Sequence, residues 1–566
     1  MTQYKAQYDE AVAQITAAGA PFEIVDQVID GVTYKCYKNA PRNLPELFAP
    51  GLEFGNKEFL VYEGERWTFA QFFQQAASIG HQLVNVYGVN KGDRIALAMR
   101  NYPEWMTAFV AVTSVGAVAV PLNSLGQAKE LEYGLTDAGA NIVICDQQRF
   151  DHIAPRLSEL GIRAVVARST AAALPENVQT LEDFIAPAAN ASMPKVDIDP
   201  EDLALIMYTS GTTGNPKGAM SCHRALCQGI MNFECTATVS AMTNPEAIGR
   251  MLEKGYEASG ILAVPLFHIS GCHAQFLVSL RGGRKIVIMY KWDAAKALAY
   301  VESERVTTLA AAPSMLMELL EAPEFDTTDT NSLFAMGAGG AATPPKVTKL
   351  TAEKVPDGYP GTGWGMTETN GLGSSFTGKA YHYKSASAGF LHPIANIEIR
   401  DDDGNVLAQG EAGNIWIKGP TLITEYWNKP EANAKEFKEG WFLSGDIGYF
   451  DDEGFLFLSD RAKDMVIRGG ENIYPVEIES TLLDHPAVRE VAAFGVPHEK
   501  LGEELAAVVV TKADLSVTAE EITAFASERL ARFKVPTQVA LQSEPLPRNA
   551  TNKVLKKQVK EAFLQR

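Results

Sequence analysis

The sequence predicts an α/β protein with a large N-terminal domain and a small α+β C-terminal lid. The chain has 566 residues, which is too many for one simple core. Between about residues 60 and 310, apolar β-rich runs alternate with amphipathic stretches, and between about 385 and 460 short strands and turns replace the helices. We therefore expect a buried sheet wrapped by helices, then an antiparallel β subdomain, then the lid.

Strands of the N-terminal domain are expected at residues 94–99, 117–120 and 141–145, which are short and apolar. The most apolar window, residues 105–120, contains Thr and Ser and is short for a bilayer span. We interpret this window as a buried helix that runs into a strand. No integral membrane segment is therefore expected.

The antiparallel subdomain is marked by the turn sequences Asp-Asp-Gly at 402–404 and Asp-Glu-Gly at 452–454. In the lid, a helix is expected from about Pro475, and strands are expected at 491–496 and 506–511. A further helix should begin after Thr518, because that residue and Glu521 have the spacing of a capping box.

Composition narrows the class of protein. With 46% hydrophobic and 21% charged residues, the chain is typical of a globular enzyme. A formal net charge of -19 at pH 7 would repel a polyanion, so no nucleic-acid partner is expected. The N-terminal stretch has no basic region followed by an apolar core, which predicts a cytoplasmic protein. The six cysteines have no metal-binding spacing, and we interpret them as reduced structural thiols.

The strongest local motif is Tyr-Thr-Ser-Gly-Thr-Thr-Gly-Asn-Pro-Lys-Gly at residues 208–218. It follows an apolar run at 203–207, and we expect a strand, a loop and a helix in succession, which is a phosphate-binding arrangement. Glycines let the backbone approach an anion, and Lys217 supplies positive charge. The spacing differs from a Walker loop, because Pro216 precedes the lysine and Gly218 follows it. The predicted nucleotide-binding residues are Thr209, Ser210, Gly211, Thr212, Thr213, Gly214 and Lys217.

A second glycine cluster, Gly-Ala-Gly-Gly-Ala-Ala at 337–342, matches a degenerate dinucleotide fingerprint. It supports an alternative of another class, an NAD-dependent oxidoreductase. Pro344 and Pro345 follow the turn directly, and the cluster lies far from the first βαβ unit. We therefore interpret Gly339 and Gly340 as part of a small-residue wall that leaves space for a flat substrate, and we also count both among the predicted ATP/AMP-binding residues.

The second half of the expected site is Gly-Trp-Gly-Met-Thr-Glu-Thr at residues 363–369. Trp364 can stack on adenine, Thr367 can contact the α-phosphate, and Glu368 can hold a Mg2+ ion that bridges phosphate oxygens. Further along, Asp446 suits ribose hydroxyls, and a nearby arginine can share that work. The predicted nucleotide-binding residues here are Gly363, Trp364, Gly365, Met366, Thr367, Asp446 and Arg461, with Glu368 as the metal ligand.

Taken in this order, the motifs resemble the adenylate-forming superfamily of acyl-CoA synthetases, adenylation domains and luciferases, over roughly residues 60–560. The sequence Arg-Gly-Gly-Glu-Asn-Ile-Tyr-Pro at 468–475 looks most like fatty-acyl-CoA ligases. The resemblance implies that a carboxylate attacks the α-phosphorus of ATP to give an acyl-adenylate and pyrophosphate, and that a thiol then displaces AMP. ATP, Mg2+ and coenzyme A are the implied cofactors and co-substrate.

The same resemblance gives Lys553 a catalytic role in the first step, where it stabilises developing negative charge, with Thr209 and Glu368 as the other catalytic residues. It divides the chain into an N-terminal domain at residues 1–460, a hinge at 461–464 that contains Lys463, and a mobile lid at 465–566. After the first step the lid should rotate about the hinge and withdraw the lysine.

One residue departs from the family pattern. Family members usually have Gly immediately before the catalytic lysine, whereas this chain has Asn552. Asn is the next most favourable residue for a left-handed backbone, so we expect the change to be tolerated.

The sequence indicates the carboxylic acid substrate and the thiol acceptor less specifically than it indicates the nucleotide site. Residues 264–271 resemble the gate motif that precedes the acyl pocket, and residues 236–259 can reshape that pocket or form a dimer contact, which leaves a homodimer open. The residues expected to line the acyl pocket or thiol tunnel are His268, Gly339, Gly365, Gly470 and Glu471. A mostly apolar lining favours a fatty, aromatic or alicyclic acid. Free CoA is favoured over a carrier protein in trans, since no carrier segment is fused, and a luciferase-like oxygenase remains a rival.

Overall fold

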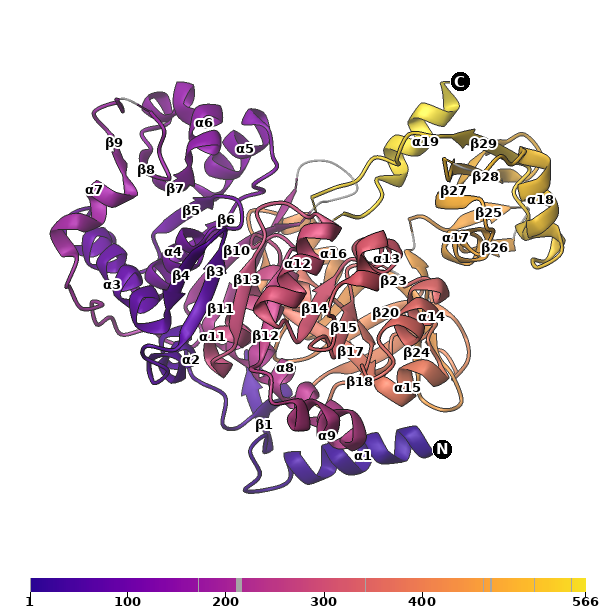
Figure 1. The fold of residues 1–566 in the computed structure, drawn as a ribbon, viewed down its shortest axis with the longest axis horizontal. Coiled ribbons are helices and arrows are strands. Elements are labelled where there is room, and N and C mark those ends of the chain that lie inside the picture. Colours follow the sequence, from indigo (N-terminus) through magenta and orange to yellow (C-terminus); the bar gives the residue numbers. More distant parts are fainter. Residues whose placement is uncertain are drawn as a thin grey trace.

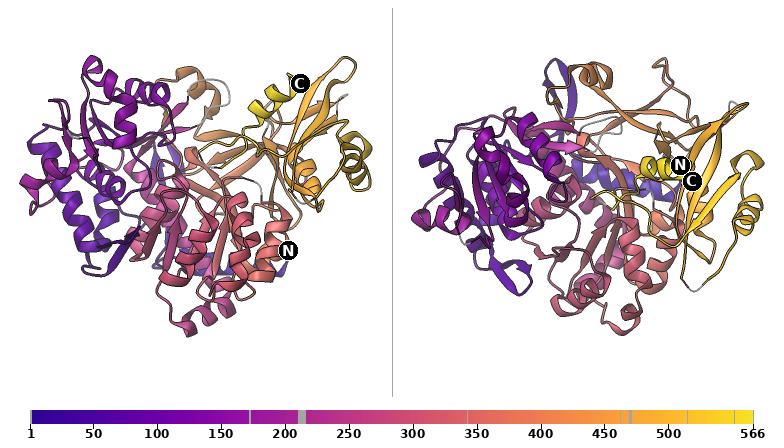
Figure 2. Two further views of the ribbon diagram at one scale, coloured as in Figure 1. Left: turned by 45° about the horizontal axis from the view of Figure 1, so that its top comes forward. Right: turned by 90° about the horizontal axis from the view of Figure 1, so that it is seen from above.

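Two large sheets, a smaller antiparallel sheet and a separate C-terminal unit make up the fold (Figure 1). The computed structural model describes residues 2–171, 173–209, 216–341, 343–461, 463–468, 471–513, 515–550 and 552–565. In Figure 1 the C-terminal unit, coloured yellow, lies to one side of the large sheets, and Figure 2 shows the same ribbon from two further directions. The predicted α/β fold class with an antiparallel subdomain and a small C-terminal α+β domain is confirmed.

The first large sheet has eight strands, and six of them run parallel. In spatial order they are β21 (Glu425–Tyr426), β11 (Lys217–Cys222), β10 (Leu203–Thr209), β6 (Val118–Pro121), β5 (Arg94–Ala98), β7 (Ile142–Asp146), β8 (Arg163–Ala167) and β9 (Val178–Thr180). The three strands expected from the apolar runs are therefore present as β5, β6 and β7. The most apolar window forms the buried helix α4 (Pro103–Ser114) followed by β6, as predicted.

The second large sheet has nine strands. In spatial order they are β18 (Phe390–Leu391), β17 (Gly371–Thr377), β16 (Gly361–Met366), β15 (Ala335–Ala338), β14 (Thr308–Ala311), β12 (Ser259–Leu262), β13 (Lys285–Ile288), β3 (Glu58–Tyr62) and β4 (Glu65–Thr68). Strands β16, β15, β14, β12, β13 and β3 are parallel, so their carboxyl ends lie at one edge. In α/β sheets this is the edge that binds ligands.

Helices between and outside the two sheets complete the large core. One continuous apolar cluster joins both sheets with α2 (Leu44–Leu52), α3 (Phe69–Asn85), α4 and α8 (His223–Thr243). A second cluster packs α5 (Ala128–Ala138) and α6 (Gln147–Leu160) on the other face of the eight-stranded sheet. The remaining long helices of this part are α12 (Ala294–Glu304), α13 (Pro313–Glu321) and α14 (Pro345–Lys354).

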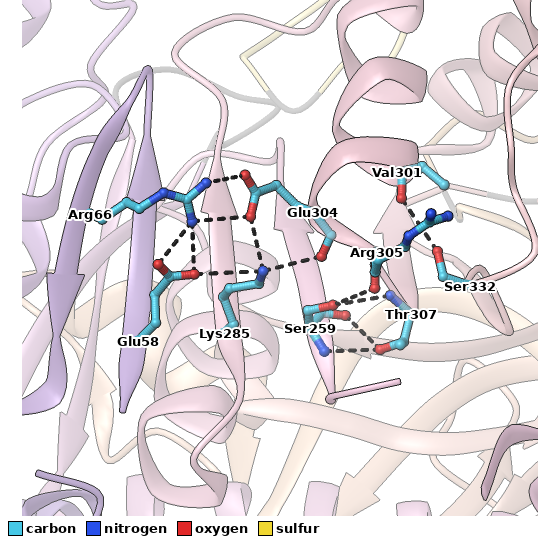
Figure 3. A network of polar contacts seen from close by, with 9 residues as sticks. All are labelled: Glu58, Arg66, Ser259, Lys285, Val301, Glu304, Arg305, Thr307 and Ser332. Atoms are coloured by element: carbon cyan, nitrogen blue, oxygen red, sulfur yellow. Dashed lines mark hydrogen bonds and ion pairs between the residues drawn. The ribbon is translucent and has the colours of Figure 1, made fainter. Parts of the chain in front are cut away.

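A polar network fastens the amino-terminal edge of the nine-stranded sheet (Figure 3). Arg66 donates to Glu58 on β3 at 2.8 Å and to Glu304 on α12 at 2.6 Å, and Lys285 on β13 reaches Glu304 at 2.9 Å. Neighbouring hydrogen bonds in the same view join Ser259, Val301, Arg305, Thr307 and Ser332. These ion pairs therefore stabilise the amino-terminal edge of the sheet, opposite the carboxyl-terminal edge at which α/β sheets bind ligands.

The segment after the phosphate loop differs from the prediction. A helix was expected there, but Lys217 begins strand β11, which pairs with β10 as an antiparallel hairpin and on its other side with β21. The helix α8 starts only at His223. Backbone pairing with β10 on one side and β21 on the other satisfies the polar groups of β11, and this tertiary pairing outweighs the local helical pattern.

The antiparallel subdomain forms where the turn sequences predicted it. Its strands are β19 (Asn396–Arg400), β20 (Gly413–Lys418), β22 (Phe437–Lys438), β23 (Trp441–Phe450) and β24 (Leu456–Arg461). In both predicted turns an aspartate accepts backbone hydrogen bonds: Asp401 from Asn405, and Asp451 from Glu453 and Phe455. These side-chain caps explain why Asp and Gly mark the turns.

The C-terminal unit has its own core, built only from residues after 465. Its elements are β25 (Val466–Arg468), β26 (Glu471–Ile473), α17 (Pro475–Leu483), β27 (Val488–His498), β28 (Gly502–Thr511), α18 (Ala519–Ser527), β29 (Gln538–Gln542) and α19 (Lys556–Leu564). The predicted helix start at Pro475 and the capping box of Thr518 with Glu521 are confirmed.

An N-terminal layer covers the side of α8. Helix α1 (Gln3–Thr16) packs Ala11 and Ile15 against that helix, and a hairpin of β1 (Ile24–Ile29) and β2 (Val32–Tyr37) follows. The stretch at residues 236–259 forms the end of α8, then α9 (Pro245–Lys254), and reaches β12. All six cysteines are buried and free. None of the described helices combines the length and the apolar character required to cross a membrane.

Candidate active site

The two described ends of the phosphate motif, Thr209 and Lys217, lie at the loop end of the β10–β11 hairpin. Thr209, the last residue of β10, is the backbone partner of Lys217, the first residue of β11, and its hydroxyl lies 3.4 Å from the lysine carbonyl oxygen. The hairpin therefore holds a hydroxyl and an ammonium group side by side at the base of the loop. The predicted residues Ser210, Gly211, Thr212, Thr213 and Gly214 lie outside the described part of the chain.

Lys217 is engaged by two groups from the segment that follows β20. Its Nζ lies 2.9 Å and 3.0 Å from the two carboxylate oxygens of Glu436, at the end of α16 (Pro430–Glu436). The same Nζ lies 3.8 Å from the centroid of the Tyr426 ring, a cation–π contact. The ammonium group of Lys217 is therefore held between the Tyr426 ring and the Glu436 carboxylate.

Tyr426 links the phosphate motif to the second motif. Its hydroxyl donates a hydrogen bond of 2.8 Å to Glu368, which lies in the short helical turn η4 (Thr367–Thr369) after β16. Burial raises the pKa of Tyr426 far above its ordinary value, and the carboxylates of Glu368 and Glu436 raise it further. The phenol therefore stays protonated and donates to Glu368. Two motifs that are about 150 residues apart in the chain thus meet on one side chain.

The residues predicted to bind the nucleoside lie on β16, β23 and β24. The indole of Trp364 donates a hydrogen bond of 2.7 Å to Asp446, and both residues are buried, at 5% and 7% exposed. Adenine can therefore reach only a small part of the Trp364 ring, and stacking there stays a prediction. Asp446 and Arg461 are direct backbone partners on adjacent strands, although the Arg461 side chain lies outside the described part.

The predicted small-residue wall lies at the carboxyl-terminal edge of the nine-stranded sheet. Gly339 follows β15, and its amide donates to Ala311 at the end of the neighbouring strand β14. Gly340 has a φ of 81°, which favours glycine. The next strand, β16, carries Gly363, Gly365 and Met366, and it leads directly to Thr367 and Glu368.

The loop that carries Lys553 reaches from the C-terminal unit to this edge. Figure 1 shows the segment before α19 extending toward the large sheets. Within the loop, the Lys553 amide donates to the side chain of Asn549 at 2.9 Å, and the Asn549 amide donates to the Lys553 carbonyl at 2.8 Å. Asn552 has a φ of 65° and donates from Nδ2 to the hydroxyl of Ser314, 2.7 Å away, in the first turn of α13. The expected left-handed backbone at Asn552 is confirmed.

Sequence comparison decides the family. Residues 50–427 match the AMP-binding enzyme family, and residues 477–553 match the AMP-binding enzyme C-terminal domain. The chain belongs to the AMP-binding enzyme family. It is an AMP-forming acyl-CoA ligase, and this assignment replaces the oxidoreductase alternative that rested on the glycine cluster.

Three known proteins illustrate the similarity. A long-chain-fatty-acid–CoA ligase of Mycobacterium tuberculosis, FadD13, is 34% identical over 501 residues, covering 88% of this chain and 93% of that protein. A 2-succinylbenzoate–CoA ligase of a Geobacillus species is 34% identical over 506 residues, covering 88% and 94%. The structure of ATP-bound MatB from Rhodopseudomonas palustris is 29% identical, with a TM-score of 0.77 and coverage of 91% and 98%.

The predicted gate motif of this AMP-binding enzyme follows β12. His268 caps the short helix α10 (Ile269–Gly271), and its Nδ1 lies 2.9 Å from the Ser270 hydroxyl. Burial lowers the pKa of His268 to about 4, so the imidazole is neutral at physiological pH. The gate motif thus presents a neutral ring at the same sheet edge as the glycine wall.

A second histidine near the gate has no counterpart among the predicted residues. His273 lies in the π-helical turn η2 (Cys272–Leu277), is fully buried, and has neither ring nitrogen in hydrogen-bond geometry with a described residue. Burial and the neighbouring His268 lower its pKa to about 3, while the Asn370 side chain partly opposes this change. Its spacing of five residues from His268 is the only signal in the sequence.

The remaining predicted positions lie at the junction with the C-terminal unit. Lys463 lies in a turn between β24 and β25, and Glu471 is the exposed first residue of β26. Gly470 lies outside the described part of the chain. The hinge at 461–464 and the tunnel roles of Gly470 and Glu471 stay predictions.

The metal ligand can be tested for its fit to Mg2+. Among the described residues there is no group of three or more His, Cys, Asp or Glu side chains that could hold a metal ion. Glu368 is a single carboxylate at the sheet edge, oriented by Tyr426. Magnesium usually takes one or two carboxylates together with waters and substrate phosphates, so one oriented carboxylate fits this mode.

Sequence reasoning missed the residues that connect the motifs. Tyr426 contacts Glu368, and Glu436 contacts Lys217. Ser314 contacts Asn552. Tyr426, Glu436 and Ser314 lie outside the recognised motifs, and each contact joins residues that are far apart in the chain. Local patterns contain no signal for such partners.

Proposed function

We propose that this chain is an acid–CoA ligase that activates a hydrophobic carboxylic acid as its acyl-adenylate and then forms the acyl-CoA. The observation that supports this most strongly is the meeting of Lys217 and Glu368 on Tyr426. Lys217, the proposed phosphate-binding cation, and Glu368, the proposed metal ligand, both contact Tyr426, and the Lys553 loop contacts the first turn of α13 at the same sheet edge, which supports this proposal.

In the first step, a carboxylate oxygen of the acid attacks the α-phosphorus of ATP, and the bond to the leaving pyrophosphate breaks. Lys217 would neutralise charge on the β- and γ-phosphates, and Thr209 and Thr367 would donate hydrogen bonds to phosphate oxygens. Lys553 would bridge the carboxylate and the α-phosphate, where negative charge develops. Mg2+ held by Glu368 would supply additional charge neutralisation when bound.

Binding of the nucleoside would use the other end of the site. Asp446 would accept hydrogen bonds from the ribose hydroxyls, and its bond from Trp364 fixes the carboxylate in place. Arg461, its backbone partner, would lie beside the same sugar. Orienting the ribose fixes the α-phosphorus relative to the incoming acid, which is the main contribution an enzyme can make to this reaction.

In the second step, a thiol sulfur attacks the acyl carbonyl carbon, and AMP leaves with the electron pair of the broken bond. We favour the thiol of coenzyme A, because the fatty-acyl-CoA and 2-succinylbenzoate–CoA ligases similar to this chain are named for that acceptor. A carrier protein in trans remains the alternative acceptor. The hinge at Lys463 would allow Lys553 to leave before the thiol arrives.

The acid should be largely apolar. The wall of Gly339, Gly340 and Gly365 and the neutral His268 offer no charged partner for a second carboxylate or an ammonium group. His273 adds a buried polar ring beside the gate, which would favour an acid that carries a carbonyl or hydroxyl acceptor. The similar ligases act on acids as different as fatty acids and 2-succinylbenzoate.

The test is pyrophosphate release with ATP, Mg2+ and a panel of acids, with and without CoA. The panel should contain straight-chain, aromatic and alicyclic acids, and for each chain length an unsubstituted acid and its oxo-acid. Acid-dependent release that CoA converts into steady formation of acyl-CoA and AMP would support the ligase. Release without a thioester would transfer the acceptor role to a carrier protein, and no release with any acid would contradict the proposal.

A further inference from the structure

The residue before Lys553 makes the close polar contact between the C-terminal unit and the nine-stranded sheet. Asn552 Nδ2 lies 2.7 Å from Ser314 Oγ. Ser314 lies in the first turn of α13, three residues after β14. Because β14 is the neighbour of β15, the contact lies beside Gly339 at the carboxyl-terminal edge.

Asn552 meets two demands at one position. Its φ of 65° is the left-handed conformation, which Gly adopts freely and which Asn tolerates best among residues with a side chain. Gly at this position would keep the turn but would have no side-chain amide to donate to Ser314. Asn therefore allows the turn and adds a contact to the other domain.

The loop itself is held from the side of the C-terminal unit. The guanidinium of Arg548 donates to the Asn552 carbonyl at 2.7 Å and to Glu490 on β27 at 2.8 Å. Together with the two bonds between Asn549 and Lys553, these contacts make the loop a defined structure. A contact at Asn552 thus fixes the position of the next residue, Lys553.

A second contact between the two units involves the other end of the same helix. Lys512, after β28, lies 3.8 Å from Glu321 at the end of α13. Burial and the neighbouring Lys346, which itself pairs with Glu321 at 2.6 Å, lower the pKa of Lys512. The long distance and the shared carboxylate make this ion pair weaker than the hydrogen bond at Asn552. Helix α13 is therefore the docking element, with Ser314 as its short-range contact.

We propose that Asn552 is a positioning residue for adenylation, whose hydrogen bond to Ser314 latches the C-terminal unit in the orientation that presents Lys553 to the acid and ATP. The proposal rests on the proposed role of Lys553. Rotation to the thiol-transfer orientation breaks this bond, so the latch favours the first half-reaction over the second. A chain with Gly at this position has the turn without the latch.

The kinetic test separates the two half-reactions. Adenylation is followed by acid-dependent exchange of pyrophosphate into ATP, and thiol transfer by acyl-CoA formation from supplied acyl-adenylate. Asn552→Gly and Ser314→Ala should each lower exchange about two- to tenfold, the range of one hydrogen bond, without slowing thiol transfer. The double variant should be no slower than the slower single variant, because both remove one contact. Ser314→Thr keeps the hydroxyl and should retain exchange.

Ser527→Ala is the matched control. Ser527 is an exposed residue at the end of α18, and its hydroxyl donates to Thr523 of the same helix, so the same chemical change should leave both half-reactions unaltered. Equal slowing of both half-reactions, additive losses in the double variant, or unchanged exchange in Asn552→Gly would each overturn the latch.

A structural measurement separates failure of the latch from failure of the proposed function. Spin labels at Lys349→Cys on α14 and Lys557→Cys on α19, both exposed, report the distance between the two units. The main distance between the two labels in the parent chain corresponds to the latched orientation. In Asn552→Gly, the population at this distance should fall about two- to tenfold relative to the other distances. If the distance shifts but the parent chain shows no pyrophosphate exchange, the proposed function is contradicted and the latch is supported. If the parent chain shows exchange but the distance does not shift, only the latch is contradicted.

Discussion

The hydroxyl of Tyr426 lies 2.8 Å from a carboxylate oxygen of Glu368 and donates a hydrogen bond to it. The ring of the same tyrosine lies beneath the ammonium group of Lys217. The three side chains belong to β21, η4 and β11, elements that contact one another only in the folded chain. One phenol therefore sets the separation between the phosphate-binding cation and the predicted metal ligand.

Replacing Tyr426 by Phe should lower kcat/KM for ATP about tenfold and raise the Mg2+ concentration for half-maximal rate. The variant keeps the ring beneath Lys217 but removes a hydrogen bond to an ionised group, worth about 1.5–3 kcal/mol. Initial rates at varied ATP and Mg2+ check this. Tyr87→Phe, which removes a hydroxyl that bonds to Gln179, is the matched control. An unchanged Mg2+ dependence would show that Tyr426 does not orient Glu368.

Replacing Glu436 by Gln should tighten ATP binding about two- to fivefold. The Lys217 and Glu436 side chains are 23% and 25% exposed, and a pair of this kind is worth about 0.2–1 kcal/mol, which ATP must displace. Isothermal titration with ATP in the absence of acid measures the effect. Glu431→Gln, on the same helix and exposed, should bind ATP like the parent. Weaker binding would mean that the carboxylate orients the lysine rather than competing with phosphate.

Replacing Lys553 by Ala should reduce adenylation about 100- to 1000-fold, because the variant loses a group that stabilises developing charge. Thiol transfer from supplied acyl-adenylate should remain largely intact. Pyrophosphate exchange and acyl-CoA formation measured on the same preparation check this. The control is Lys557→Ala on α19, where the lysine side chain is 78% exposed. Loss of both half-reactions in Lys553→Ala would contradict the assigned role.

The network in Figure 3 should make stability depend on pH. Burial would raise the pKa of Glu304, but hydrogen bonds from Arg66 and Lys285 outweigh it and hold the pKa below its ordinary value. A lowered folded-state pKa contributes stability above the unfolded-state pKa of about 4.3, and the contribution is lost as pH falls through the folded-state pKa. Glu304→Gln should therefore destabilise the chain by about 1 kcal/mol at pH 7 and by less below pH 4.

Calorimetric unfolding of the parent and of Glu304→Gln at both pH values measures this difference. Glu528→Gln removes the carboxylate of an exposed pair with Arg529 and should change stability little at either pH. A Glu304→Gln penalty that does not shrink in acid would show that the side chain contributes through packing rather than charge.

Much of the fold could be predicted, because its signals are local. The apolar runs of β5, β6 and β7, the Asp-Gly turns of the antiparallel sheet and the capping box at Thr518 all appear within a few residues of the sequence. Each signal corresponds to a local physical requirement, such as burial on both faces, a turn conformation or a free backbone amide. Elements of this kind need no knowledge of the rest of the chain.

The strand β11 shows where such reasoning fails. Its residues follow the predicted phosphate loop and are expected from the sequence to begin a helix, but they form a hairpin with β10 and also pair with β21, some 200 residues away. The contacts of Tyr426 and Ser314 could not be predicted for the same reason, because each joins segments that are far apart in the chain. Motifs predict which residue types the chemistry needs, whereas the partners that orient them are supplied by distant segments, and their identity follows only from the fold.

The separate core of the C-terminal unit has a consequence for how such ligases diversify. Its two apolar clusters contain no residue from the N-terminal part of the chain, whereas His268, Gly339, Gly340 and Gly365 all lie in that part, in or directly after strands of the nine-stranded sheet or at the start of α10. If the proposed roles hold, choice of acid and timing of the two half-reactions depend on different parts of the chain. Exchanging the C-terminal unit between ligases should therefore transfer the relative rates of the two half-reactions and leave the substrate specificity of the recipient unchanged. The donor unit must carry a residue that can contact Ser314.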